Sequence, residues 1–284
     1  MFGLPLARAF TLSRPRFWLY ELGTFALGVI MALSIYHDTN WWLVGFFALY
    51  FLFPANLLIY GINDVYDYET DLRNPKKQGY EDVLAPALHT PVLRLVLWTS
   101  VPFVLVALVL SKAALLAFMA FLFFAIYYSM PPVRAKARPV FDSLFSAGHY
   151  VATGVFGYFV AGASGDVLLP VVAGMLWAMA MHAYSAVPDI KADSEAGVPT
   201  IATFLGARRT IMVCLLAYAA AGLIGYLYLD WWALLLSLPY LVLMVRSLWC
   251  DEVALLRLYT YFPYLNALVG MVIFLLVLSD KLYG

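Results

Sequence analysis

Two groups of acidic side chains each follow a long apolar stretch, and together they could hold a divalent cation. The second group repeats the one-turn spacing of the first at an offset of 126 residues. Ionisable side chains are costly to keep beside a bilayer, and there they mark functional sites by default. The first group comprises Asn63, Asp64, Asp67 and Asp71, and the second comprises Asp189 and Asp193.

The chemistry that this spacing supports is magnesium binding. Mg²⁺ prefers hard oxygen ligands and is often held by one or two carboxylates together with substrate phosphates. If the apolar helix continues past Ile62, Asn63, Asp67 and Asp71 share one face. We therefore expect a magnesium–diphosphate site in which Asp64 is a further catalytic acid. The expected metal ligands are Asn63, Asp67, Asp71, Asp189 and Asp193.

A diphosphate also needs basic and polar neighbours, and the sequence offers both near the acids. Lys and Arg bind phosphates through charge-assisted hydrogen bonds. The basic candidates are Lys77, Arg134, Lys136 and Lys191. The other expected substrate-binding residues are Asn56, Tyr66, Tyr128, Tyr184 and His182.

Several of these residues have a structural alternative. His182 lies two turns before Asp189 and could be a base or simply a hydrogen-bond partner between helices. Asp142 and His149 have the same seven-residue spacing, and Asp142 could merely begin a helix. Tyr66 and Tyr184 lie close to the acidic groups, although membrane proteins also place tyrosine at the bilayer interface. A single acidic run after a membrane helix is usually a solvated loop, but two runs in register favour a site.

Composition places the chain among integral membrane proteins. Hydrophobic residues make up 64% of it and charged residues 12%, against about 45–50% and about 25% in soluble domains. The net charge of zero gives no indication of nucleic-acid binding. Cys214 and Cys250 have no metal-binding spacing and are expected to be small buried hydrophobes.

The apolar runs predict nine membrane-spanning helices. They are too long and continuous for the alternating segments of a barrel, and a helix satisfies its own backbone hydrogen bonds in lipid. The expected spans are 17–36, 41–62, 92–111, 113–130, 140–162, 168–188, 209–229, 231–250 and 258–279.

The basic residues predict the orientation of the helices. With the N-terminus in the cytoplasm, only Lys112 and Lys281 of the 17 Lys and Arg residues lie on the opposite side. Both acidic groups then face the cytoplasm. The offset between them spans four helices, which suggests two parallel four-helix pseudo-repeats followed by a ninth helix.

The motifs resemble those of the UbiA superfamily of intramembrane prenyltransferases. The pattern Asn-Asp-x-x-Asp-x-x-x-Asp matches residues 63–71, and Asp-x-x-x-Asp matches residues 189–193. Residues 128–136 resemble the loop after the fourth helix of the family. The resemblance implies a single multi-pass cell-membrane domain over 1–284, with the nine-helix bundle of the family, Mg²⁺ as cofactor and an isoprenyl diphosphate substrate.

Within the superfamily, the chain is most similar to the lycopene elongases of C50 carotenoid synthesis, some of which are also hydratases. The segments that carry this likeness are 13–20, 54–77, 179–189 and 262–266. The likeness implies dimethylallyl diphosphate as donor and lycopene as acceptor. Glu21 departs from the small or apolar residue expected at its position.

Three alternatives remain open on the sequence. Prenyl transfer to an aromatic or other polar acceptor would use the same motifs. A divalent-cation transporter could also carry acids in two repeats, although transporters usually bind at the bilayer midplane. A non-catalytic partner in a membrane complex is the third.

Overall fold

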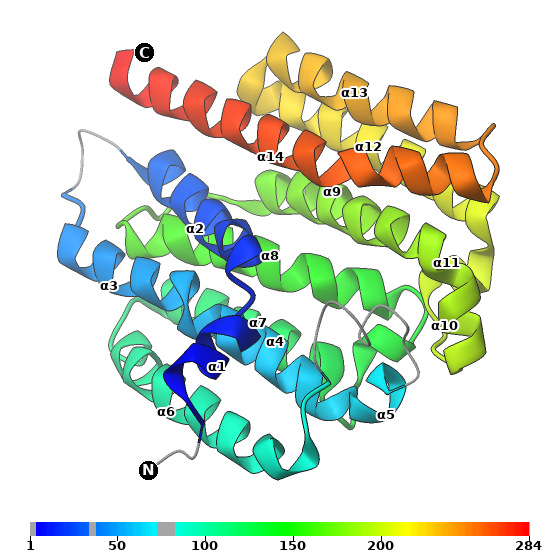
Figure 1. Ribbon diagram of the computed structural model, residues 1–284. Coiled ribbons are helices and arrows are strands. Elements are labelled where there is room, and N and C mark those ends of the chain that lie inside the picture. The colour runs from blue at the N-terminus through cyan, green and yellow to red at the C-terminus, as the bar shows by residue number, and fades with distance from the viewer. Residues whose placement is uncertain (1–3, 34–37, 73–82, 284) are drawn as a thin grey trace. The chain divides into compact units, whose positions relative to one another are not determined.

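The computed structural model describes residues 4–33, 38–72 and 83–283, and in these ranges every regular element is a helix (Figure 1). This confirms the all-α class. The chain divides into two compact units, each described here by itself. The first comprises Met1–Arg134 and Ala152–Ser164, and the second comprises Ala135–Val151 and Gly165–Gly284. These units do not coincide with the two predicted four-helix halves, because residues 152–162 of the fifth predicted span (140–162) group with the first unit.

The first unit is built from helices that follow the predicted apolar runs, with one interruption. The predicted span 41–62 is two helices that meet at Phe53, because Pro54 lacks a backbone N–H and begins a new helix readily. The helices are α1 (Leu6–Leu12), α2 (Trp18–Ala32), α3 (Trp41–Leu52), α4 (Pro54–Tyr66), α5 (Tyr68–Asp71), α6 (His89–Ala107), α7 (Lys112–Ser129) and the end of α8 (Phe141–Val160).

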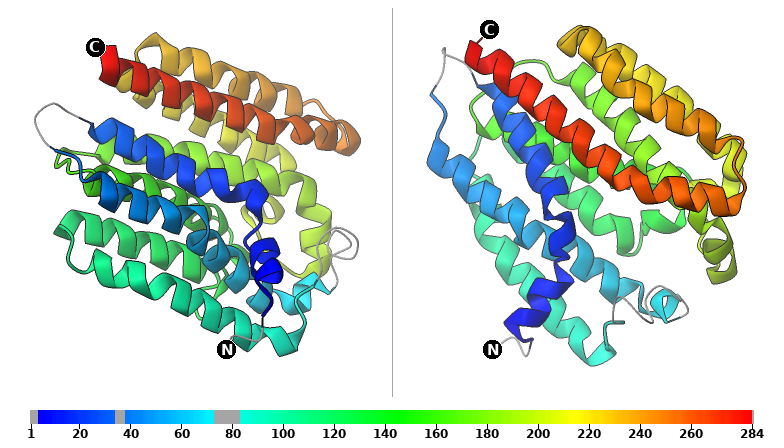
Figure 2. Two further views of the ribbon diagram at one scale, coloured as in Figure 1. Left: turned by 60° about the vertical axis from the view of Figure 1, so that its left-hand side comes forward. Right: turned by 45° about the horizontal axis from the view of Figure 1, so that its top comes forward.

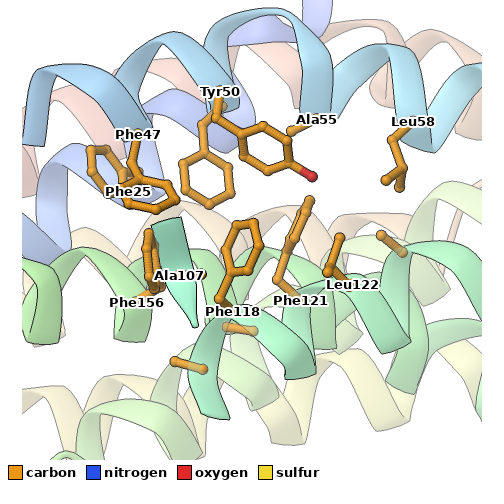
Figure 3. Close-up of a cluster of buried hydrophobic side chains, with 14 of the residues drawn as sticks. Phe25, Phe47, Tyr50, Ala55, Leu58, Ala107, Phe118, Phe121, Leu122 and Phe156 are labelled. Atoms are coloured by element: carbon orange, nitrogen blue, oxygen red, sulfur yellow. The ribbon is translucent and has the colours of Figure 1, made fainter. Parts of the chain in front are cut away.

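Aromatic side chains fill the centre of the first unit (Figure 3). Phe47 on α3 meets Phe156 on α8 edge to face, with ring centroids 4.6 Å apart. Phe118 on α7 lies 5.1 Å from the same Phe156 ring. All three side chains are fully buried. In lipid, such close packing rather than water exclusion holds helices together. The cluster therefore joins α3, α7 and α8, and α4 continues the chain from α3.

Glycines allow α2 and the end of α8 to approach very closely. A Cβ on Gly28 would collide with the Gly154 carbonyl, and one on Gly157 would collide with the carbonyl of Phe25. Beside this contact, Thr153 Oγ1 donates a hydrogen bond of 2.8 Å to Glu21 Oε2, and both residues are buried. The acid that departs from the expected residue type therefore has a polar partner across the helix pair.

The second unit packs α9, α12 and α13 together, and the latter two run side by side in both views (Figures 1 and 2). Tyr218 on α12 stacks on Tyr240 of α13 at 4.6 Å, and Tyr240 donates a 3.0 Å hydrogen bond to Asn266 Oδ1. The helices are the start of α8, α9 (Leu168–Ala186), α10 (Ile190–Ala196), α11 (Ile201–Leu205), α12 (Ala207–Leu229), α13 (Trp231–Ser247) and α14 (Glu252–Tyr283).

Six helical segments of the described residues are long and apolar enough to cross a membrane, so the chain is a multi-pass membrane protein. They are Trp41–Tyr66, Pro86–Ala107, Lys112–Ser129, Leu168–Ala196, Ala207–Leu229 and Glu252–Tyr283, and Trp231–Ser247 is a shorter apolar helix. The count of nine spans and the cytoplasmic N-terminus stay predictions.

Candidate metal and diphosphate site

The first acidic group lies where α4 ends and α5 begins. The helix does continue past Ile62, but α4 ends at Tyr66, and Asp67 leaves the helical conformation at φ −101° and ψ 2° before α5 begins. The one-turn spacing nevertheless survives. Asp67 N donates to Asn63 O at 2.9 Å, and Asp71 N donates to Asp67 O at 2.8 Å. Asn63, Asp67 and Asp71 therefore stay one helical turn apart although the helix is interrupted between them.

The carboxylates of this group are buried. Asp64 is 6% exposed, Asp67 is 1% exposed and Asp71 is 8% exposed. A buried charge is stable only when it is paired or hydrogen-bonded. These side chains therefore require cationic partners, and the structure shows two of them.

Arg14 is the partner of Asp64. Its Nη2 donates to Asp64 Oδ1 at 2.8 Å, and its guanidinium lies 4.7 Å from the ring centroid of Tyr60. Arg14 has φ 49°, in the left-handed region that few residues other than glycine adopt. Such strain concentrates at functional sites, where the surrounding contacts hold it in place. The conformation turns the chain between α1 and α2 so that the guanidinium reaches α4.

Arg134 is the corresponding partner of Asp67. Its Nη2 lies 3.8 Å from Asp67 Oδ1, at ion-pair rather than hydrogen-bond distance, and its side chain is 38% exposed. It also has positive φ, 43°, and its N–H donates to Met130 O at 3.0 Å. The structure thus brings the predicted diphosphate ligand Arg134 to the first acidic group.

Asn63 is fixed by its amide nitrogen. Nδ2 donates to Ser129 Oγ on the last turn of α7 at 3.0 Å. The side-chain carbonyl oxygen is the atom that would bind a metal. Asn56 is used differently, because its Nδ2 donates to Phe51 O at 2.8 Å and Leu52 O at 3.2 Å. It donates to two carbonyl groups at the C-terminal end of α3, and its role in substrate binding stays a prediction.

The second acidic group begins a short helix. Asp189 ends a 3₁₀ turn (Val187–Asp189) and is the N-cap of α10, and Asp193 lies in the first turn of that helix. Val198 N donates to Asp193 O at 2.9 Å as the chain turns through Gly197, which has φ 68°. Lys191 is exposed on the same helix. The one-turn spacing of the two acids is therefore observed, with a 3₁₀ start.

The donor set of the first group fits Mg²⁺. Three buried carboxylates and an amide carbonyl lie within nine residues, and arginine now supplies part of the opposing charge. Among the residues that the structure describes, no three Asp, Glu, His or Cys side chains cluster closely enough to hold a metal. Mg²⁺ is commonly held by one or two carboxylates, with water and substrate phosphate completing its shell. That the two acidic groups share one site stays a prediction.

The other predicted residues have varied surroundings. Tyr184 is fully buried, and its hydroxyl lies 2.9 Å from Ser247 Oγ, so it is a core residue of the second unit as well as a candidate. Tyr66 and Tyr128 are half-buried at the ends of α4 and α7. Lys136 is half-buried in the 3₁₀ turn Ala135–Ala137. Lys77 lies outside the described residues.

Sequence reasoning did not place Arg14 or Ser129 in the site. Each reaches the first motif from a distant segment, 50 residues from Asp64 and 66 residues from Asn63 respectively. A signal existed for both, since segments 13–20 and 128–136 carry the family resemblance. Position in a motif does not by itself say which partner a side chain has.

We expect Arg14→Gln to destabilise the metal-free protein by about 3 kcal/mol, because it leaves a buried carboxylate without its cation. The measurement is the free energy of unfolding in detergent, with Arg16→Gln as the control on an exposed arginine of the same segment. Adding Asp64→Asn to Arg14→Gln should recover much of the lost stability, since the double variant no longer buries an unpaired carboxylate at position 64. Equal stabilities of the two single Arg variants would contradict the assigned ion pair.

Comparison with known proteins gives a consistent result. A profile described as "UbiA prenyltransferase family" matches residues 22–251. The lycopene elongase/hydratase of Haloarcula japonica is 36% identical over 274 residues, covering 96% of this chain and 92% of that protein. The protein of the same description from Halobacterium salinarum is 41% identical over 269 residues, covering 93% of this chain and 94% of its own length.

The fold also has solved counterparts. A UbiA homologue from Archaeoglobus fulgidus, solved with DMAPP and Mg²⁺, superposes with a TM-score of 0.68. The match covers 95% of this chain and 99% of that one at 19% identity. At this identity the likeness concerns the fold.

Proposed function

Since the chain belongs to the UbiA prenyltransferase family, we propose that it transfers a dimethylallyl unit from dimethylallyl diphosphate to lycopene in C50 carotenoid synthesis, with or without hydration. Its class as a prenyltransferase excludes a cation transporter or a non-catalytic partner as its main role. The proposal that lycopene is the acceptor rests on the similarity to lycopene elongase/hydratases, which extends over more than nine-tenths of both chains.

The acidic groups supply the metal side of the reaction. Asn63, Asp67, Asp71, Asp189 and Asp193 would hold Mg²⁺. Bound Mg²⁺ neutralises charge on the departing diphosphate and so lowers the barrier to its release. The solved homologue with DMAPP and Mg²⁺ supports this assignment.

The basic side chains complete the binding of the diphosphate. Arg134 lies beside Asp67 already, and Lys136, Lys191 and Lys77 are the further candidates. As the allylic C–O bond breaks, its electron pair leaves with the diphosphate, and these cations stabilise the charge that develops. Arg14 keeps Asp64 in position beside the ligands.

The acceptor then completes the carbon–carbon bond. The π electrons of the terminal double bond of lycopene attack the allylic carbon, and a tertiary cation forms on the neighbouring acceptor carbon. Loss of a proton gives a new double bond, whereas addition of water followed by loss of its proton gives an alcohol. The ring faces of Tyr66 and Tyr184 are the candidates to stabilise the cation. Tyr184 is fully buried in the core of the second unit, so Tyr66 is the more accessible of the two.

We place the protein in the cell membrane, with both acidic groups at the cytoplasmic border. Support comes from the basic residues, of which 15 of 17 fall on that side in the predicted topology. Dimethylallyl diphosphate is water-soluble and would enter from the cytoplasm, whereas lycopene would enter from lipid.

A lycopene-producing host that expresses this chain tests the assignment. We expect pigment extracts to gain carotenoids that are heavier than lycopene by one and two C5 units, with or without added water. Purified protein with Mg²⁺, dimethylallyl diphosphate and lycopene should reproduce the products. Unchanged lycopene beside prenylation of an added phenolic acid would contradict the acceptor and favour transfer to an aromatic substrate.

A further inference from the structure

A buried carboxylate and an imidazole lie together in the second unit, on helices that the metal site does not account for. Asp142 is at the start of α8, and His182 is on α9, seven residues before Asp189. His182 Nε2 is 3.9 Å from Asp142 Oδ2. We propose that His182 accepts the proton released when the tertiary cation is quenched, and that Asp142 positions its imidazole. This rests on the proposed function.

Asp142 is held as a fixed partner. Its Oδ2 accepts a 2.9 Å hydrogen bond from Ile201 N at the start of α11, and the residue is 1% exposed. Its other oxygen, Oδ1, is buried and receives no hydrogen bond from any side chain or backbone group in the described ranges. A buried carboxylate with an incomplete set of hydrogen bonds is costly. An imidazolium that forms beside it as His182 accepts a proton would offset that cost.

The backbone at the start of α8 places the Asp142 side chain in the protein interior. Val140 has φ 73°, a conformation that is strained for a β-branched residue. Val140 and Phe141 are 46% and 49% exposed, whereas Asp142, the next residue, is 1% exposed. A helix that merely needed a polar start would leave the acid outside. The strained backbone instead points to a required position for the carboxylate.

The imidazole remains reachable, unlike its partner. The His182 side chain is 19% exposed against 1% for Asp142. The roles resemble those of the acid–histidine pair of a hydrolase, in which the acid orients the imidazole and the imidazole accepts the proton. The 3.9 Å separation is loose, as is common before a substrate binds. His149, buried two turns along α8 from Asp142, is the other histidine near this pair.

The position along α9 suits the chemistry. The last turn of α9 and the 3₁₀ turn Val187–Asp189 separate His182 from Asp189, a rise of about 12 Å. The diphosphate would be at the acidic groups, while the cation forms on the hydrocarbon acceptor, farther along the substrate. In hydration, the water oxygen bonds to the cationic carbon and one of its protons passes to the imidazole of His182. In elimination, the electrons of a C–H bond form the double bond, and that proton passes to the same imidazole.

The test separates donor ionisation from cation quenching. For His182→Gln, we expect carotenoid product to fall about 100-fold, while diphosphate release from dimethylallyl diphosphate changes by less than about threefold. Imidazole added to His182→Ala should restore part of the product. His89→Gln is the matched control. His89 lies at the start of α6, and its assigned hydrogen bond is with the backbone carbonyl of Leu84, not with a residue of either acidic group.

Asp142 needs its own readout, because it would act through His182. We expect Asp142→Asn to lower product about tenfold at an unchanged KM for the donor, and Asp142→Glu to recover part of that loss. If product and diphosphate release fall together in His182→Gln, through misfolding or otherwise, the inference is overturned, and full product yield overturns it equally. If the wild-type protein itself does not elongate lycopene, the proposed function fails first.

Discussion

Asp67→Ala is expected to lower kcat/KM for dimethylallyl diphosphate by about 1000-fold, which corresponds to about 4 kcal/mol of transition-state stabilisation. Asp67 is 1% exposed and is the middle member of the first acidic group. Its loss removes a proposed metal ligand and the carboxylate that lies beside Arg134. Arg134 is 38% exposed on its side chain, so water can solvate the guanidinium and the fold should survive.

Glu69→Ala is the matched control for this variant. Glu69 lies on α5, two residues from Asp67, but it is exposed. Both variants should reach the membrane in normal amounts, and only Asp67→Ala should lose product formation and its response to added Mg²⁺. Wild-type-like turnover by Asp67→Ala would refute its assignment as a metal ligand.

Asp193→Ala is expected to cause a loss of the same size, about 1000-fold, from the second acidic group. The backbone carbonyl of Asp193 closes the end of α10 through Val198 N, and this bond does not depend on the side chain. A carboxylate in the first turn of a helix contributes only about 0.3–1 kcal/mol through the helix dipole. Helix α10 should therefore form in the variant. Glu195→Ala, exposed on the same helix, is the control.

Combining the two changes tests whether the acidic groups share one site. Groups that act as a unit are strongly non-additive, so the double variant Asp67→Ala/Asp193→Ala should be little worse than either single variant. Product formation and the Mg²⁺ concentration for half-maximal activity are the measurements. Multiplied losses, or a double variant whose Mg²⁺ response matches that of the wild type, would indicate separate roles.

Local features of the site were predictable from the sequence. The one-turn spacing of Asn63, Asp67 and Asp71 follows from helical geometry, and it persists although α4 ends at Tyr66. The sequence also contained the reason for the break at Phe53, because Pro54 cannot continue a backbone hydrogen-bond ladder. We nevertheless expected one helix there, since an apolar run of that length indicates a single span.

By itself, the sequence determined the membrane class, the all-helical fold and the one-turn spacing of the acids in each group, because composition and spacing are local properties of the chain. The metal chemistry of the two groups stays a prediction. Only the tertiary structure decided the partners: Arg14 for Asp64, Ser129 for Asn63, and the approach of His182 to Asp142. Those contacts join segments 40 to 66 residues apart. The sequence around a side chain does not indicate which distant helix will pack against it. These pairs form only in the folded chain, where buried charges find partners and helices pack closely at the same time.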